Sequence, residues 1–151
     1  DKGYTYKFND FKFINNSLNA LKYLSKKKVW VFIITNQAGI AKGYYTENDF
    51  KNLHLKLKKK LLNKKIFIDE VKYCPYHPKA TLLEYKKNSS LRKPDNLMIK
   101  QLFKTWVIDK KKSIMIGDQI KDYKCADKSK IKFQYVENNM LRQLKNYLNK
   151  I

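Results

Sequence analysis

Polar residues follow apolar runs of this chain at the points where the runs end. They are Thr35-Asn36 after residues 29–34, Gly117-Asp118 after residues 113–116 and, between these two places, Arg92-Lys93. A hydroxyl group, neighbouring backbone N–H groups and a lysine are suited to phosphate oxygens, and an aspartate beside them can hold Mg²⁺. The spacing therefore predicts a phosphate and magnesium site, at which phosphoryl transfer is the chemistry to expect.

Strands alternating with helices must position these residues. The apolar run 29–34 predicts a strand of a parallel sheet whose side chains are covered on both faces, and residues 113–116 predict a second, short buried strand. Residues 66–73 and 132–136 are also expected to form strands. Ligands of such sheets bind beyond the carboxyl ends of the strands. The residues that follow positions 34, 73 and 116 should therefore face one crevice.

Helices are expected in the segments between these strands. We expect them to start near Ser17, Thr46 and Pro94, and to cover residues 120–128 and 140–148. Thr46 and Asp49 have the spacing of a capping box, and Phe50, Leu53, Leu57 and Leu61 follow at helical spacing. This pattern predicts one long helix with a single buried face.

The motifs resemble those of a known family. Residues 35–43 are similar to the second motif of the heptose bisphosphate and histidinol phosphate phosphatases of the haloacid dehalogenase (HAD) superfamily. Arg92-Lys93-Pro94 resembles the third motif and Gly117-Asp118 the fourth. The resemblance runs from Asp1 to about Val136. It implies one α/β domain over residues 1–151, with a Rossmann-like parallel sheet sandwiched by helices.

The resemblance also implies a role for individual residues. Thr35 and Lys93 would be catalytic, because they would stabilise the transferring phosphoryl group, and Asp118 would bind Mg²⁺, the expected cofactor. Asp122 would support the loop that carries Asp118. The implied substrate-binding residues are Asp1, Lys2, Gly3, Tyr4, Thr35, Asn36, Gln37, Ala38, Arg92 and Lys93.

One family motif is missing from the sequence. Members of the family carry Asp-x-Asp-Gly-Thr on the first, central strand, a few residues before the position of Asp1, and its first aspartate becomes the phosphoaspartate. Asp1 and Asp10 lie after that position and do not replace it. We therefore expect the chain as given to lack its first strand and its nucleophile, and to be inactive.

Residues 74–93 resemble the zinc-binding insertion of the family without most of its ligands. Cys74 is retained, but Tyr76, Ser89 and Leu91 stand where the family has one histidine and two cysteines. Structural zinc needs four ligands. We therefore expect a remnant of the insertion that binds no zinc and is ordered by packing.

The composition is strongly basic, with a formal charge of +21. Nearly all of this charge is lysine, since Arg92 and Arg142 are the two arginines. Arginine binds phosphate in a planar, bidentate fashion, so a surface selected for polyanions should retain more of it. An AT-rich genome, whose codons favour lysine, explains the pattern better than a surface for polyanions, and both explanations stay open.

Other sequence features limit the setting of the protein. The longest apolar run falls far short of the roughly 20 residues that span a membrane. Cys74 and Cys125 are too few for a disulfide scaffold. We expect a cytoplasmic monomer that has no membrane partner.

The leading hypothesis for function is a Mg²⁺-dependent phosphatase whose partner is a small phosphorylated sugar. The resemblance favours D-glycero-D-manno-heptose 1,7-bisphosphate, cleaved at C7 through an aspartyl-phosphate. Histidinol-phosphate phosphatase is the nearest alternative. A polynucleotide 3′-phosphatase is another, since such enzymes carry similar motifs and a nucleic acid partner would suit the charge. A third reading is a basic binding module without catalysis.

Overall fold

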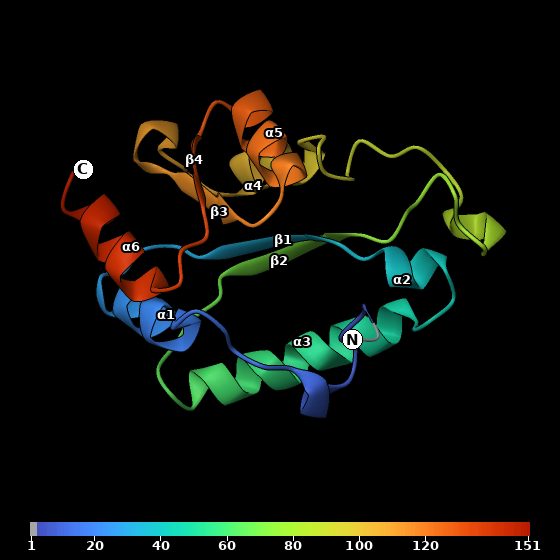
Figure 1. The fold of residues 1–151 in the computed structure, drawn as a ribbon, viewed down its shortest axis with the longest axis horizontal. Helices are drawn as coiled ribbons and strands as arrows, with labels where there is room; N and C mark the ends of the chain where they lie inside the picture. The colour runs from blue at the N-terminus through green and yellow to red at the C-terminus, as the bar shows by residue number, and fades with distance from the viewer. Residues whose placement is uncertain (1–2) are drawn as a thin grey trace.

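The computed structural model describes residues 3–151, which form alternating strands and helices (Figure 1). The strands are β1 (Phe32–Asn36), β2 (Glu70–Cys74), β3 (Ile114–Gly117) and β4 (Lys132–Tyr135). The helices are α1 (Ser17–Lys26), α2 (Ala38–Ala41), α3 (Glu47–Leu62), α4 (Leu97–Thr105), α5 (Ile120–Ser129) and α6 (Met140–Leu148). Short 3-10 turns are η1 (Phe8–Asp10), η2 (Leu83–Tyr85) and η3 (Lys110–Lys112).

The strands pair in parallel, as predicted. β1 pairs with β2, with Asn36 opposite Cys74 at the carboxyl end, and β3 pairs with β4. Within residues 3–151 no backbone ladder joins β1 to β3, so the expected single sheet is present as two parallel ladders of two strands each. The predicted parallel α/β class is confirmed.

Side chains that alternate along β1 face two different layers. Ile33 packs with Leu57 and Leu61 of α3, whereas Ile34 packs with a cluster that includes Ile99 of α4 and Met115 of β3. Figure 1 shows α3 on one side of the β1–β2 ladder and β3, β4, α4 and α5 on the other. The predicted sandwich of strands between helices is therefore confirmed around β1.

The first three strands start later than predicted, whereas β4 starts at Lys132 as predicted. The prediction for the first strand was residues 29–34, but β1 starts at Phe32 and continues through Asn36. Asp69 explains the late start, because its carboxylate accepts a hydrogen bond of 2.7 Å from the Val31 N–H and its own N–H donates to the Val31 carbonyl. Thr35 and Asn36 therefore lie on the end of the strand rather than in the loop after it.

Helix α3 has the predicted start and the predicted buried face. Thr46 and Asp49 form a reciprocal capping box, and Phe50, Leu53, Leu57 and Leu61 are buried. Helix α1 starts at Ser17 as predicted, but Asn16, with a φ of 61°, holds its cap position. Helix α4 starts at Leu97 and not near Pro94, because residues 89–95 form turns.

The first and the last α-helices pack against each other in one cluster. Ala20 and Leu24 of α1 pack against Leu144 of α6, and both helices lie together at one end of the molecule in Figure 1. Among residues 3–151, every helix is too short or too polar to cross a membrane. The segment between β2 and α4, residues 74–93, projects at the opposite end of Figure 1 and is called the 74–93 segment below.

Candidate functional site

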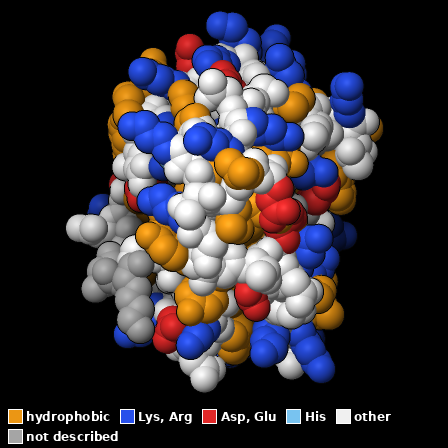
Figure 2. Space-filling view, turned by 90° about the vertical axis from the view of Figure 1, so that its right-hand side faces the viewer, with side chains coloured by type: hydrophobic (Ala, Val, Ile, Leu, Met, Phe, Trp, Pro, Cys, Tyr) orange, Lys and Arg blue, Asp and Glu red, His pale blue; other side chains and the backbone are white. Residues whose placement is uncertain are grey.

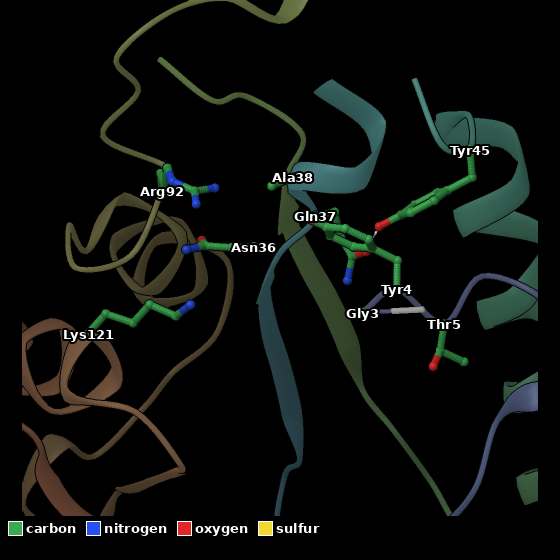
Figure 3. Close-up of a pocket in the computed structure, with 9 residues that line it drawn as sticks. All are labelled: Gly3, Tyr4, Thr5, Asn36, Gln37, Ala38, Tyr45, Arg92 and Lys121. Atoms are coloured by element: carbon green, nitrogen blue, oxygen red, sulfur yellow. Dashed lines mark hydrogen bonds between the residues drawn. The ribbon is translucent and has the colours of Figure 1, made fainter. Parts of the chain in front are cut away.

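A cavity of about 400 Å³ opens at the carboxyl end of β1 (Figure 3). It is lined by Gly3, Tyr4, Thr5, Asn36, Gln37, Ala38, Tyr45, Arg92 and Lys121. Most of these residues belong to the predicted substrate-binding set, and the exceptions are Thr5, Tyr45 and Lys121. Two members of that set, Asp1 and Lys2, lie outside the described residues. The structure thus brings residues from four distant stretches of the chain to one hollow.

Asn36 fastens the end of β1 to the start of the Arg-Lys-Pro motif. Its side-chain amide donates to the carbonyl of Lys93, and its side-chain carbonyl accepts from the Lys93 N–H, both at 3.0 Å. The two residues are 57 positions apart in the sequence. This pair of hydrogen bonds fixes the backbone next to Arg92, so the guanidinium reaches the cavity from a fixed position of the backbone.

The Lys93 side chain lies beside the cavity and does not line it. Its ammonium group forms an ion pair of 2.6 Å with Asp122 and donates a hydrogen bond of 3.1 Å to the carbonyl of Ile34. Burial alone would raise the pKa of the Asp122 carboxyl. The hydrogen bond and charge of Lys93, with smaller contributions from the backbone N–H groups of Gln119 and Asp118, hold that pKa below its ordinary value. Lys93 and Asp122 therefore form a charged pair at neutral pH.

Asp122 also holds the loop that carries Asp118. Its second carboxylate oxygen accepts from the N–H groups of Asp118, at 3.2 Å, and Gln119, at 3.0 Å. Gly117 makes this close approach feasible, because a Cβ atom there would lie 2.4 Å from the Asp122 Cβ. Asp118 itself is exposed at the end of β3 and does not line the cavity.

A chain of hydrogen bonds runs from Tyr45 to Thr35. The Tyr45 hydroxyl donates a hydrogen bond to the Gln37 side-chain carbonyl (dashed in Figure 3). The Gln37 amide in turn donates a hydrogen bond of 2.9 Å to the Thr35 hydroxyl oxygen. Thr35 therefore accepts with a lone pair and keeps its own proton available for another acceptor. Burial, and then the nearby Tyr4, raise the pKa of Tyr45 to about 12, so its hydroxyl remains a donor well above neutral pH.

Gly39 allows Tyr45 to reach Gln37. A Cβ atom on Gly39 would lie 2.1 Å from the Tyr45 ring, which is far inside van der Waals contact. The ring is buried and stacks on Tyr6, with the two ring centroids 5.2 Å apart. The glycine of the second motif therefore has a packing role that the sequence alone does not show.

The 74–93 segment is anchored by a carboxylate and aromatic rings. Glu47, in the first turn of α3, accepts hydrogen bonds from the hydroxyl of Tyr73 and, at 3.1 Å, from that of Tyr85. The Lys87 ammonium lies 3.7 Å from the ring centroid of Tyr76. Backbone bonds from Thr81 and Leu82 to the carbonyl of Ala41 tie the segment to the end of α2. Packing and hydrogen bonds therefore order the segment.

The donor set suits Mg²⁺ better than zinc. Mg²⁺ is usually held by one or two carboxylates, with substrate oxygens and water completing its shell, and Asp118 offers one accessible carboxylate at a strand end. Residues 3–151 contain no cluster of three or more histidine, cysteine, aspartate or glutamate side chains, whereas structural zinc requires four ligands. The cysteine of the segment, Cys74, is a buried free thiol whose hydrogen faces the Tyr76 carbonyl.

Sequence reasoning missed three residues of the cavity. Thr5 directly follows the predicted Gly3-Tyr4 contact, so it could have been included with it. Lys121 follows Asp118 by three positions, and a helix starting at residue 120 would have placed it at the same end of the sheet. Tyr45 had no comparable signal, because its contact with Gln37 depends on how α2 turns back.

Comparisons with known proteins agree with this architecture. A family model described as polynucleotide kinase 3 phosphatase matches residues 2–142. A protein from Haemophilus influenzae is 36% identical over 132 residues, which is 87% of this chain and 71% of the relative. One from Photorhabdus laumondii is 36% identical over 131 residues, 87% of this chain and 70% of the relative. Both relatives are named D-glycero-beta-D-manno-heptose-1,7-bisphosphate 7-phosphatase.

Solved structures share the fold at lower identity. A HAD-like phosphatase from Mesorhizobium loti superimposes with a TM-score of 0.85 and 20% identity, over 99% of this chain and 80% of the other. The D,D-heptose 1,7-bisphosphate phosphatase from B. bronchiseptica, complexed with magnesium and phosphate, superimposes with a TM-score of 0.79 and 16% identity. The match covers 100% of this chain and 92% of the other. The family model and the relatives above 30% identity, taken together with this fold, establish that the chain belongs to the polynucleotide kinase 3 phosphatase family of HAD-like phosphatases.

Proposed function

We propose that the protein is a Mg²⁺-dependent phosphatase that removes the C7 phosphate from D-glycero-D-manno-heptose 1,7-bisphosphate. The reaction transfers the C7 phosphoryl group to water and leaves the C7 hydroxyl, heptose 1-phosphate and inorganic phosphate. One observation carries the proposal: Asn36, Gln37, Ala38 and Arg92 line a single cavity at the carboxyl end of β1. The names of the Haemophilus and Photorhabdus relatives support this choice of sugar.

Arg92 in the cavity wall and Thr35, which does not line the cavity, can both act on a phosphate group in this reaction. The free proton of the Thr35 hydroxyl can donate to a phosphate oxygen, because the Gln37 amide already occupies one of the hydroxyl's lone pairs. Arg92 can bind phosphate through its planar set of N–H donors. Such preorganised donors stabilise the charge that develops during phosphoryl transfer.

Lys93 and Asp118 complete the proposed site around the cavity. The Lys93–Asp122 pair holds a positive group directly beneath the end of β1, where the Ile34 carbonyl accepts from it. Asp118 is the carboxylate that would hold Mg²⁺, and the bound ion would neutralise charge on the phosphate oxygens. Asp122 would act through the loop, since both of its oxygens are already occupied.

The test is a substrate assay followed by ³¹P NMR, carried out with a chain that includes the Asp-x-Asp-Gly-Thr motif, because residues 1–151 are expected to be inactive without its nucleophilic aspartate. With Mg²⁺, the signal of the C7 phosphate should disappear and that of inorganic phosphate should rise, while the C1 phosphate stays intact. Removal of Mg²⁺ with EDTA should stop the change. Histidinol phosphate serves as the control substrate, and faster release of phosphate from it than from the heptose would contradict the proposal.

A polynucleotide 3′-phosphatase is the second candidate, favoured by the description of the matching family and by the charge of +21. A basic nucleic-acid surface usually forms a patch or stripe. On the face shown in Figure 2, lysine and arginine side chains are scattered, with acidic and apolar side chains between them. This dispersal supports the sugar phosphate as substrate.

Salt dependence separates the two candidates. A protein that binds several phosphates of a polynucleotide releases counterions, so its affinity falls steeply as salt rises. We expect a shallow dependence for heptose bisphosphate and weak binding of a 3′-phosphorylated oligonucleotide. Tight, steeply salt-dependent binding of the oligonucleotide, together with release of its 3′ phosphate, would favour the second candidate.

The proposal also covers the setting of the reaction. A small anionic sugar is the partner, and we expect a monomer in the cytoplasm. The free thiols of Cys74 and Cys125 suit a reducing compartment. Sedimentation of the purified protein at micromolar concentration checks whether it is a monomer, and a stable dimer would contradict that expectation.

A further inference from the structure

The positive side chains at the cavity differ in whether an acidic side chain neutralises them. The Lys93 ammonium is neutralised by Asp122 at 2.6 Å, and its side chain is 11% exposed. Of the residues that line the cavity, Arg92 and Lys121 are positively charged, and no aspartate or glutamate is among those described. The wall of the cavity therefore carries two positive charges that no acidic side chain of the wall offsets.

Of the two cations in the cavity wall, Lys121 is the one that has no partner among the described residues. Among residues 3–151 its ammonium group forms no ion pair and no hydrogen bond. Lys128, on the same helix, is paired with Asp95 at 2.5 Å. Arg92 by contrast donates, at 3.4 Å, to the carbonyl of Tyr76. The unpaired charge of Lys121 is thus the one most available to an incoming anion.

The position of Lys121 directs this charge into the cavity. The side chain is half-buried, and Figure 3 shows it extending from α5 towards Asn36, across the hollow from Tyr4 and Thr5. Arg92 reaches the same side from another segment. Lys121 also lies in the first turn of α5, where the helix dipole disfavours a cation. A bound anion would offset both the partial burial and this unfavourable position.

We propose that Lys121 binds a phosphate oxygen of the substrate, as the second cation of the cavity beside Arg92. The identity of the sugar rests on the proposed function, but the role of Lys121 requires only a phosphate group. Lys121 then supplies charge that Lys93 cannot supply in full, because Lys93 is already paired with Asp122. Direct contact makes Lys121 a substrate-binding residue that the three family-like motifs do not include.

Calorimetric titration with inorganic phosphate in the presence of Mg²⁺ tests this role without requiring turnover. Lys121→Gln should weaken binding about tenfold, which corresponds to roughly 1.4 kcal/mol. Lys121→Arg, which keeps the charge, should stay within about threefold of the wild type. Lys124→Gln removes an exposed lysine from the same helix and should change binding less than twofold. Equal binding by the Lys121→Gln and Lys124→Gln variants would overturn the inference.

A parallel titration with heptose 1,7-bisphosphate separates the two proposals. If Lys121→Gln weakens phosphate binding while the heptose is not bound, the role of Lys121 stands and the proposed substrate falls. If the heptose binds tightly and Lys121→Gln matches Lys124→Gln for both ligands, the role of Lys121 falls alone. A wild-type protein that binds neither ligand also overturns the inference. Circular dichroism of each variant confirms that it is folded.

Discussion

The cavity and the 74–93 segment are held in place by different kinds of contact. At the cavity, short polar side chains on a strand end bind distant backbone, as Asn36 binds Lys93. The segment is held from outside by Glu47, at the start of α3, which accepts from Tyr85 of the segment and from Tyr73 of β2 next to it. The cavity keeps the residue types of its motifs, whereas the segment has lost all but one of the metal ligands that its resemblance implies and is nevertheless ordered.

This difference shows which contacts a sequence must preserve. Phosphate chemistry requires particular donors at particular positions, so few residue types can serve at the end of β1. A surface segment can be anchored by many combinations of rings, carboxylates and backbone bonds. Motifs therefore identify the cavity, and they give no account of how the segment is fixed.

Removal of the Asn36 side chain should have the largest effect. Asn36→Ala breaks two partly buried hydrogen bonds to Lys93, and we expect a loss of about 2–3 kcal/mol in the free energy of unfolding. Phosphate affinity should fall with it, because Arg92 loses its rigid base. Urea unfolding and calorimetry measure the two effects. Asn52→Ala, at an exposed position of α3, is the control. Equal stability of the two variants would show that the hydrogen bonds of Asn36 to Lys93 do not stabilise the fold.

A methyl group on Gly39 should disturb the cavity alone. Gly39→Ala forces a Cβ atom against the Tyr45 ring, and overpacking of this kind costs about 1–3 kcal/mol. The same change in a Tyr45→Ala background should cost much less, because the clashing ring is gone. Urea unfolding of the four proteins of this cycle measures the coupling. Additive effects would mean that the ring and the methyl group do not meet.

Weakening the anchor of the 74–93 segment should leave the cavity intact. Glu47→Gln weakens the hydrogen bonds from Tyr73 and Tyr85, and we expect a loss of about 1–2 kcal/mol. Hydrogen exchange should quicken over residues 76–87, with phosphate affinity changed less than twofold. Glu84→Gln, an exposed carboxylate in the same segment, is the control. A large loss of phosphate affinity in Glu47→Gln would show that the two regions are not independent.

The smallest expected effect is that of Tyr45→Phe, about 1 kcal/mol at pH 7 from the lost hydrogen bond to Gln37. Its pH dependence is more informative. The pKa of Tyr45 is raised to about 12 in the folded protein, so its contribution is complete below the unfolded value near 10 and is lost as pH rises towards 12. Urea unfolding from pH 9 to 12 should show a steeper decline for the wild type than for the variant.

Tyr44→Phe is the control for this series. Tyr44 is an exposed neighbour of Tyr45, so its variant should follow the wild type over the same range. Parallel declines for the wild type and Tyr45→Phe would contradict the raised pKa and would weaken the chain of bonds that leads to Thr35.

The sequence predicted the local features of the fold well. The capping box at Thr46, the buried face of α3 and the order of strands and helices follow from short-range patterns. The start of β1 did not, because the Asp69 side chain, 38 positions from Val31, takes the backbone N–H that a ladder would use. Side-chain contacts between distant segments decide such boundaries, and no local pattern contains them.

The same limit applies to the candidate site. Asn36, Gln37, Ala38 and Arg92, which the motifs single out, line one cavity. They did not reveal that Lys93 turns towards Asp122, or that Tyr45 reaches Gln37 past Gly39. These contacts depend on the direction of side chains after the chain has folded. The roles of Thr35, Lys93 and Asp118 in catalysis stay predictions.

Asn36 closes both ends of the 74–93 segment, and this has a consequence for the evolution of chain length. It is the ladder partner of Cys74, where the segment leaves β2, and it binds Lys93, where the segment returns. The intervening residues therefore form a loop with a fixed base. Doubling the length of a flexible loop costs only about 0.6 kcal/mol. Insertions and deletions between these two points should accumulate freely among related chains while the cavity keeps its shape.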